Sequence, residues 1–251
     1  MPVTYLDTEQ AIVRPGLRMV VVGNVPSPWG EAAKGILHMK GIDWVAVRLA
    51  YDDEAQRQWA GQRSGPIAIY DKEPPRAGWA DILLLAERLK PKPSLVPADA
   101  AERATMFGLA HEICGQEGLG WTRRLQLIHT GAFGERGGQY LGRKYGYSPA
   151  AGAAAGTRVT ALLRMLAARL AAQRLAGNPY YLGKAPTAVD IYSATCLALF
   201  KPLPAEHCPM DEPIRTAFSR PDPETDAALD PILLEHRDMM YARHLELPLS
   251  L

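Results

Sequence analysis

The sequence predicts a two-part fold, in which an α/β unit is followed by an all-helical unit. Between residues 19 and 89, short β-branched runs alternate with amphipathic helical stripes, which is typical of strands joined by helices. The proline-rich stretch at 90–98 has no repeating apolar face, and this indicates a linker. Beyond it the strand patterns stop and Ala- and Leu-rich helical patterns follow. The expected domains are residues 17–90 and 98–251.

In the first unit the elements are expected in the order strand, helix, strand, strand, a possible short further strand, and helix. The strands are predicted at 19–22, 44–49 and 67–70, the possible further strand after the turn at 71–76, and the helices at 29–40 and 79–89. The first two strands are joined by a helix, so they should pair in parallel. Residues 51–64 are polar and are expected to be irregular, and residues 1–16 are expected to be an extension that either packs onto the body or is mobile.

In the second unit helical patterns cover most of the chain. Helices are predicted at 100–130, with a break around Gly115–Gly120, at 149–176 and from Pro231 to Leu245. Thr187 and Asp190 form a capping box in its acidic form, which starts a further helix. The many prolines between 201 and 231 predict a long irregular segment.

The composition is that of a soluble globular protein, and it argues against two kinds of partner. The net charge is +1 and no basic stripe is present, whereas nucleic-acid-binding proteins carry one. The basic pairs Arg123-Arg124 and Arg143-Lys144 are interpreted as solvated helix faces. No apolar run approaches the ~20 residues of a membrane-spanning helix. We therefore expect neither a nucleic-acid nor a membrane partner.

The cysteines point to a reducing compartment. Cys114, Cys196 and Cys208 are far apart, odd in number and lack the CxxC spacing of a zinc site. Disulfide frameworks belong to oxidising compartments, so a cytoplasmic location is the simplest fit. No metal site is expected.

The most informative local feature is a Ser-Pro step between a strand and a helix. Ser27 follows the turn at 23–26, and Pro28 and Trp29 open the next helix. Serine is a preferred N-cap and proline a preferred first helical residue, so the step is open to a purely structural interpretation. The alternative is functional, because a hydroxyl at the positive end of a helix attracts anions and thiolates.

Three motifs together resemble the soluble glutathione transferases. Ser-Pro-Trp-Gly-Glu at 27–31 is similar to the helix start that carries that family's thiol-activating residue. Ser-Gly-Pro-Ile at 64–67 is similar to its cis-proline step, and Pro-Thr-Ala-Val-Asp-Ile at 186–191 to the N-capping box of its second domain. The resemblance covers residues 17–245. It implies a thioredoxin-like glutathione-binding domain, an all-α C-terminal domain and a homodimer.

The resemblance also implies roles for individual residues. Ser27 would donate a hydrogen bond to the thiolate of glutathione, the co-substrate. The glutathione-binding residues would be Trp29, Gly65, Pro66, Arg76 and Gly78. The acidic-Ser pair that holds the γ-glutamyl end in the family is replaced by Ala77-Gly78, so the Gly78 N–H and the Arg76 charge would have to serve instead.

The second substrate is expected between the domains, beside the helix that begins near residue 104. Its candidate contacts are Met106, His111, Cys114 and Trp121. Each of these types is also common in a protein interior, and His111 has no histidine four residues later to form a zinc-binding helix motif.

The implied function is a glutathione transferase that activates the thiol for attack on a small apolar electrophile. Two alternatives remain open at this point. One is a non-catalytic binding or interaction protein with a degenerate thiol site, and the other is a glutathione-dependent isomerase or lyase. Pocket shape decides the electrophile, and the sequence does not specify it.

Overall fold

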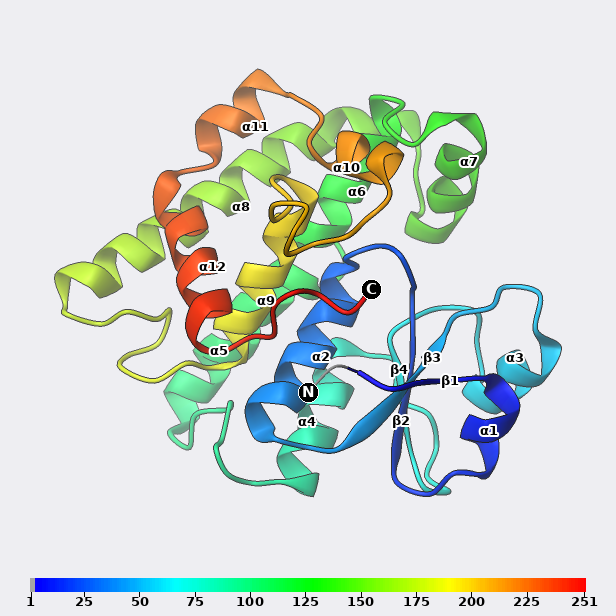
Figure 1. Ribbon diagram of the computed structural model, residues 1–251. Coiled ribbons are helices and arrows are strands. Elements are labelled where there is room, and N and C mark those ends of the chain that lie inside the picture. The colour runs from blue at the N-terminus through cyan, green and yellow to red at the C-terminus, as the bar shows by residue number, and fades with distance from the viewer. Residues whose placement is uncertain (1–2) are drawn as a thin grey trace.

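The computed structural model describes residues 3–251 and places a small sheet unit beside a larger helical unit (Figure 1). The sheet unit contains β1 (Tyr5–Leu6), α1 (Thr8–Val13), β2 (Leu17–Val21), α2 (Pro28–Lys40), β3 (Trp44–Arg48), α3 (Glu54–Ala60), β4 (Ile67–Tyr70) and α4 (Trp79–Leu89). The helical unit contains α5 (Ala100–Cys114), α6 (Leu119–His129), α7 (Gly134–Tyr145), α8 (Pro149–Leu175), α9 (Ala188–Cys196), a short 3-10 helix (Leu197–Leu199), α10 (Glu212–Phe218), α11 (Pro223–Ala228) and α12 (Pro231–Arg243). The predicted fold class is confirmed.

The sheet has the strand order β1-β3-β2-β4. The parallel pairing of β2 with β3 follows from the α2 crossover, as expected, and β4 runs antiparallel to β2. The N-terminal extension packs onto the body, since β1 pairs with β3 and aligns Tyr5 with Ala46. The possible further strand is reduced to one bridge between Ala68 and Arg76.

Both faces of the sheet are covered, so β2 is buried along its whole length, Arg18 included. Met19 and Val21 belong to the large core shared with α2 and α4, whereas Val20 faces a smaller core together with Ala11 of α1 and Ala60 of α3. Figure 1 shows α1 and α3 on the side of the sheet away from the helical unit. A strand buried on both faces has no polar alternation.

The prediction of an irregular segment at 51–64 is wrong, because α3 lies within it. The Asp53 carboxylate accepts from the Gln56 N–H and caps the helix, and Gly61 ends it in the left-handed region at φ 78°. The helix was missed because most of its residues are polar, although Asp53 and Gly61 at its ends are typical cap residues.

The prediction of a long irregular segment at 201–231 is also wrong, because α10 and α11 form there. Each begins with an aspartate N-cap, Asp211 or Asp222, and has a proline in its first turn. Proline is favoured at those positions, so these prolines start helices rather than prevent them. The other predicted helices of this unit, with the break between α5 and α6, are confirmed.

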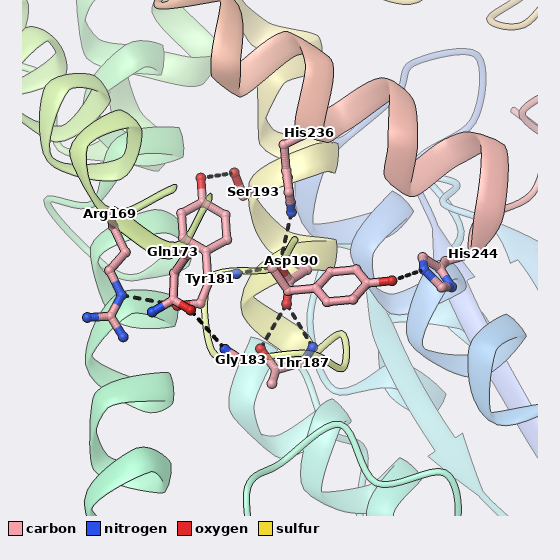
Figure 2. A network of polar contacts seen from close by, with 10 residues as sticks. Arg169, Gln173, Tyr181, Gly183, Thr187, Asp190, Ser193, His236 and His244 are labelled. Atoms are coloured by element: carbon pink, nitrogen blue, oxygen red, sulfur yellow. Dashed lines mark hydrogen bonds and ion pairs between the residues drawn. The ribbon is translucent and has the colours of Figure 1, made fainter. Parts of the chain in front are cut away.

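The capping box at the start of α9 is present and forms the centre of a buried network (Figure 2). The fully buried Asp190 carboxylate accepts from the Thr187 N–H (2.8 Å), the Thr187 hydroxyl (3.1 Å) and the Tyr181 N–H (3.0 Å). It also lies 3.0 Å from Nε2 of His236 on α12. One side chain thus joins the preceding loop, α9 and α12.

The two units meet where α2 packs on α9, and Gly35 makes that close approach possible. A Cβ at Gly35 would lie 2.8 Å from Leu245 Cδ2 and 3.0 Å from Ile191 Cγ2.

We expect Gly35→Leu to lower the free energy of unfolding by about 1–3 kcal/mol, because overpacking forces neighbours to shift. Urea unfolding measures this. Gly108→Leu is the control, since Gly108 lies in a helix with no atom within 4 Å of its Cβ position; an equal loss there would contradict the packing argument.

Within residues 3–251, no helix is both long and apolar enough to cross a membrane. No cluster of three or more His, Cys, Asp or Glu in that range is arranged to hold a metal ion. The three cysteines are free and buried.

Candidate active site

The Ser27 hydroxyl lies at the N-terminus of α2, beyond the carboxyl end of β2. The turn between them includes Asn24 at φ 60°, and Ser27 is the N-cap with extended backbone angles and Pro28 after it. The Ser27 carbonyl accepts from the Glu31 N–H at 2.8 Å, but its side chain makes no capping hydrogen bond. Within residues 3–251 this hydroxyl has no hydrogen-bond partner, so it is free to donate to a ligand.

Ser27 faces a pocket of about 500 Å³ at the junction of the two units. The sheet unit contributes the segment after β2, the start of α2, the loop after β3, and Gly65. The helical unit contributes α6, α7 and α10. The lining residues are Val22, Val25, Ser27, Trp29, Tyr51, Gly65, Arg124, Ala132, Phe133, Gly134, Gly137, Tyr140, Leu141, Lys144, Tyr145, Pro213, Ile214, Ala217 and Phe218.

Gly65 lines the same pocket and precedes Pro66 through a cis peptide bond, as the resemblance implied. A Cβ at Gly65 would approach the Val20 carbonyl oxygen and the Val22 nitrogen to 3.3 Å, so the glycine lets this loop lie close to β2. The Gly65 N–H and C=O have no partner among the described residues. An extended peptide could pair with them as an added strand would.

The polar groups of the pocket are hydrogen-bond donors, and its charged groups are positive. Arg124 and Lys144 line it, and no described lining residue is a carboxylate. Burial, followed by a hydrogen bond with Tyr140, raises the pKa of Tyr51 to about 12, and burial raises the pKa of Tyr145. Both phenols are therefore neutral donors at physiological pH.

The predicted glutathione-binding residues do not all reach this pocket. Trp29 lines it, but its Nε1–H donates to the Cys114 carbonyl at 2.8 Å and its ring stacks on Tyr145. Arg76 is paired with Glu73 at 2.7 Å, and Glu73 is shared with Arg88. The Arg76 guanidinium is therefore already engaged by a carboxylate, which it shares with Arg88.

Gly78 is the N-cap of α4. The Asp81 carboxylate lies over the start of this helix, and a Cβ at Gly78 would make that side chain turn aside. Neither Arg76 nor Gly78 lines the pocket around Ser27. The assignment of Arg76 and Gly78 to glutathione binding stays a prediction. Asp81 is an acidic residue at the same helix start that was not among the predicted binding residues.

The four residues predicted to contact the second substrate do not line this pocket. Met106 is fully buried in the core, and Cys114 is buried with a pKa raised by desolvation. His111 is exposed on α5, and Trp121 packs edge-on against Tyr145, behind the lining. None of the four is among the described lining residues, and their role stays a prediction.

None of the lining residues of the helical unit was predicted to contact a substrate. Helix α7, of which only the Arg143-Lys144 pair was interpreted, as a solvated helix face, contributes Lys144 and Tyr145, and α10 contributes Phe218. The interpretation of Arg123-Arg124 as a solvated face is wrong, because both side chains are buried. The position of this Arg-Arg pair within an apolar helical stripe was the sequence feature that could have indicated that the two side chains are buried.

Comparison with known proteins supports the architecture through structure alone. No family model matches the sequence, and no curated protein matches it. A glutathione transferase family member from Pseudomonas fluorescens Pf-5, with two glutathione bound, superposes with a TM-score of 0.65 at 13% identity over 94% of both chains. The chain has the glutathione transferase fold.

Two further solved structures agree with this fold. A glutathione S-transferase from Methylobacterium radiotolerans, in complex with glutathione sulfonate, has a TM-score of 0.62 at 17% identity over 90% of this chain and 91% of its own. A bacterial zeta-class maleylpyruvate isomerase has a TM-score of 0.53 at 19% identity over 87% of this chain and 95% of its own. The shared fold spans proteins named for different reactions, so it does not specify the reaction here.

Proposed function

We propose that the protein is a glutathione-dependent enzyme of the glutathione transferase superfamily, in which Ser27 activates the glutathione thiol. The observation that carries this proposal is the unpartnered Ser27 hydroxyl, at a helix N-terminus, facing the same pocket as the unpaired Gly65 backbone. Solved proteins of this fold were crystallised with glutathione or a glutathione derivative.

The chemistry follows from the pKa of the thiol. A free thiol has a pKa of ~8.5 and is mostly protonated at neutral pH. A hydrogen bond from Ser27 to sulfur and the positive end of α2 both favour the thiolate. Each contributes on the order of 1 kcal/mol, and together they lower the thiol pKa by about one to two units. The thiolate then attacks an electrophilic carbon, and a C–S bond forms while the bond to the leaving group, such as chloride, breaks and the leaving group departs with the electron pair.

The polar ends of glutathione have partial matches. Its cysteinyl backbone would pair with the N–H and C=O of Gly65. The start of α4 would receive the γ-glutamyl group, with the Gly78 N–H toward the carboxylate and Asp81 toward the ammonium. Arg76 would first have to leave Glu73.

Glutathione binding is the direct test of this proposal. We expect saturable binding of glutathione in isothermal titration at millimolar concentration or below, and retention on immobilised glutathione with elution by the free tripeptide. Displacement of chloride from an activated aromatic chloride should require both protein and glutathione. No heat of binding at millimolar glutathione would contradict the proposal.

A second candidate function is a non-catalytic binding protein of the same fold. The pairing of Arg76 with Glu73 and the loss of side-chain donors at Ala77-Gly78 favour it. In that case ligands would occupy the pocket without any glutathione-dependent turnover.

Under either function we also propose a homodimer, for which size-exclusion chromatography should give twice the 27.4 kDa of the chain.

A further inference from the structure

Arg123 and Arg124 are adjacent buried arginines on α6 with different hydrogen-bond partners. Only Arg124 lines the pocket that contains Ser27. Arg123 donates to the Leu199 carbonyl (3.1 Å), to Gln126 Oε1 (2.7 Å) and, at 3.4 Å, to the Arg220 carbonyl. These acceptors satisfy the Arg123 guanidinium within the protein. Arg123 is therefore a structural residue of the helical core.

Arg124 is only 7% exposed, and the Tyr145 hydroxyl is its one hydrogen-bonding neighbour among residues 3–251. Within residues 3–251 the Arg124 Nε is buried without a hydrogen-bond partner, and the Arg124 guanidinium forms no ion pair with a carboxylate. The guanidinium instead lies over the rings of Phe218 (4.7 Å) and Phe133 (5.6 Å), both of which line the pocket. A buried cation that faces a pocket without a counter-ion is costly unless a ligand supplies the negative charge.

Lys144 adds a second positive charge to the same pocket. It lies near the rim, where Nζ donates to Ser64 Oγ at 3.1 Å and lies 5.9 Å from the Tyr145 ring centroid. Desolvation and the charge of Arg124 both lower the pKa of Lys144, because the two cations repel each other. A bound anion would relieve this repulsion.

The other walls are apolar. Val25, Leu141, Ile214 and the two phenylalanines surround the space between the Ser27 hydroxyl and the arginine. This combination of aromatic surface and positive charge matches a molecule with an apolar body and one anionic end.

We propose that the pocket selects electrophiles that carry an anionic group, such as a carboxylate, on an aromatic or other apolar body. Arg124 binds the anion and Lys144 is the second cation, while the reactive carbon lies toward Ser27. As a statement about a substrate, this inference rests on the proposed glutathione chemistry. The preference for anions can be measured without glutathione.

The test compares two probes of the same shape, naphthoate and its neutral amide naphthamide, by isothermal titration. We expect the unmodified protein to bind naphthoate at least about tenfold more tightly, since hydrogen bonds to a charged group are stronger than those to a neutral one. Arg124→Gln and Lys144→Gln should each reduce that ratio by threefold or more and leave naphthamide affinity unchanged. The control Arg143→Gln removes an exposed charge next to Lys144 and should change nothing.

Lys144→Gln decides the test alone if Arg124→Gln fails to fold. Equal affinity of the unmodified protein for the two probes would overturn the proposal. So would an unchanged ratio in the folded variants, or a loss confined to glutathione affinity, which would assign the cations to glutathione itself. A strong naphthoate preference in a protein that binds no glutathione would support the anion site and refute the proposed function.

Discussion

Asp190→Ala is expected to lower the free energy of unfolding by about 3–5 kcal/mol, the largest stability effect of any substitution considered. The carboxylate is fully buried and accepts from three donors, two on Thr187 and one on Tyr181, besides lying 3.0 Å from His236 Nε2. Alanine leaves these groups buried without partners, and each unsatisfied group costs ~1–3 kcal/mol. Figure 2 shows why the loss is not local, because Asp190 on α9 is contacted by the segment before α9 and by His236 of α12.

Urea unfolding followed by circular dichroism measures this change. Asp43→Ala is the matched control, since Asp43 is exposed and surface substitutions usually stay within ~0.5 kcal/mol. Stability is typically about 5–15 kcal/mol, so Asp190→Ala would remove a large share of it. A loss below ~1 kcal/mol would show that the network is not the anchor described here.

Ser27→Ala is expected to lower glutathione-dependent turnover at pH 7 by about 10–100-fold, with little change in glutathione affinity. The hydroxyl contributes part of the ~1–2 unit decrease in the thiol pKa. The smaller fraction of thiolate at pH 7 in the variant accounts for the lower end of the expected decrease in turnover. The upper end applies if the same hydrogen bond also orients the sulfur. Steady-state kinetics across pH gives the measurement, and the deficit should shrink above the pKa of the free thiol.

Ser27→Thr is the matched control because it keeps a hydroxyl at the N-cap. It should retain most of the turnover. Turnover in Ser27→Ala equal to that of the unmodified protein would remove Ser27 from the mechanism, whatever the affinity for glutathione.

The sequence predicted those parts of the molecule in which local pattern and tertiary structure agree. The strand at 67–70, the helix from Pro28 to Lys40 and the box at Thr187–Asp190 each carry their own turn, cap or period, and all are present. Helix α3 was missed because its exposed face is polar. Helix α10 was missed because Pro213 was interpreted as a breaker rather than as a first-turn residue.

The site was only partly predictable for a physical reason. Ser27 and Gly65 lie in motifs whose function depends on local backbone, so their sequence context identifies them. The opposite wall depends on how α6, α7 and α10 pack around the sheet unit, and no short pattern encodes that packing. Arg124 and Lys144 therefore emerged only from the three-dimensional structure.

The most direct test of the account is the ionisation of bound glutathione. The ultraviolet absorbance of the thiolate should be titrated against pH in the unmodified protein and in Ser27→Ala. The account predicts a midpoint about one to two pH units below that of free glutathione, and a rise toward the free value in the variant. A bound thiol that titrates at the free value in the unmodified protein would contradict thiol activation at Ser27.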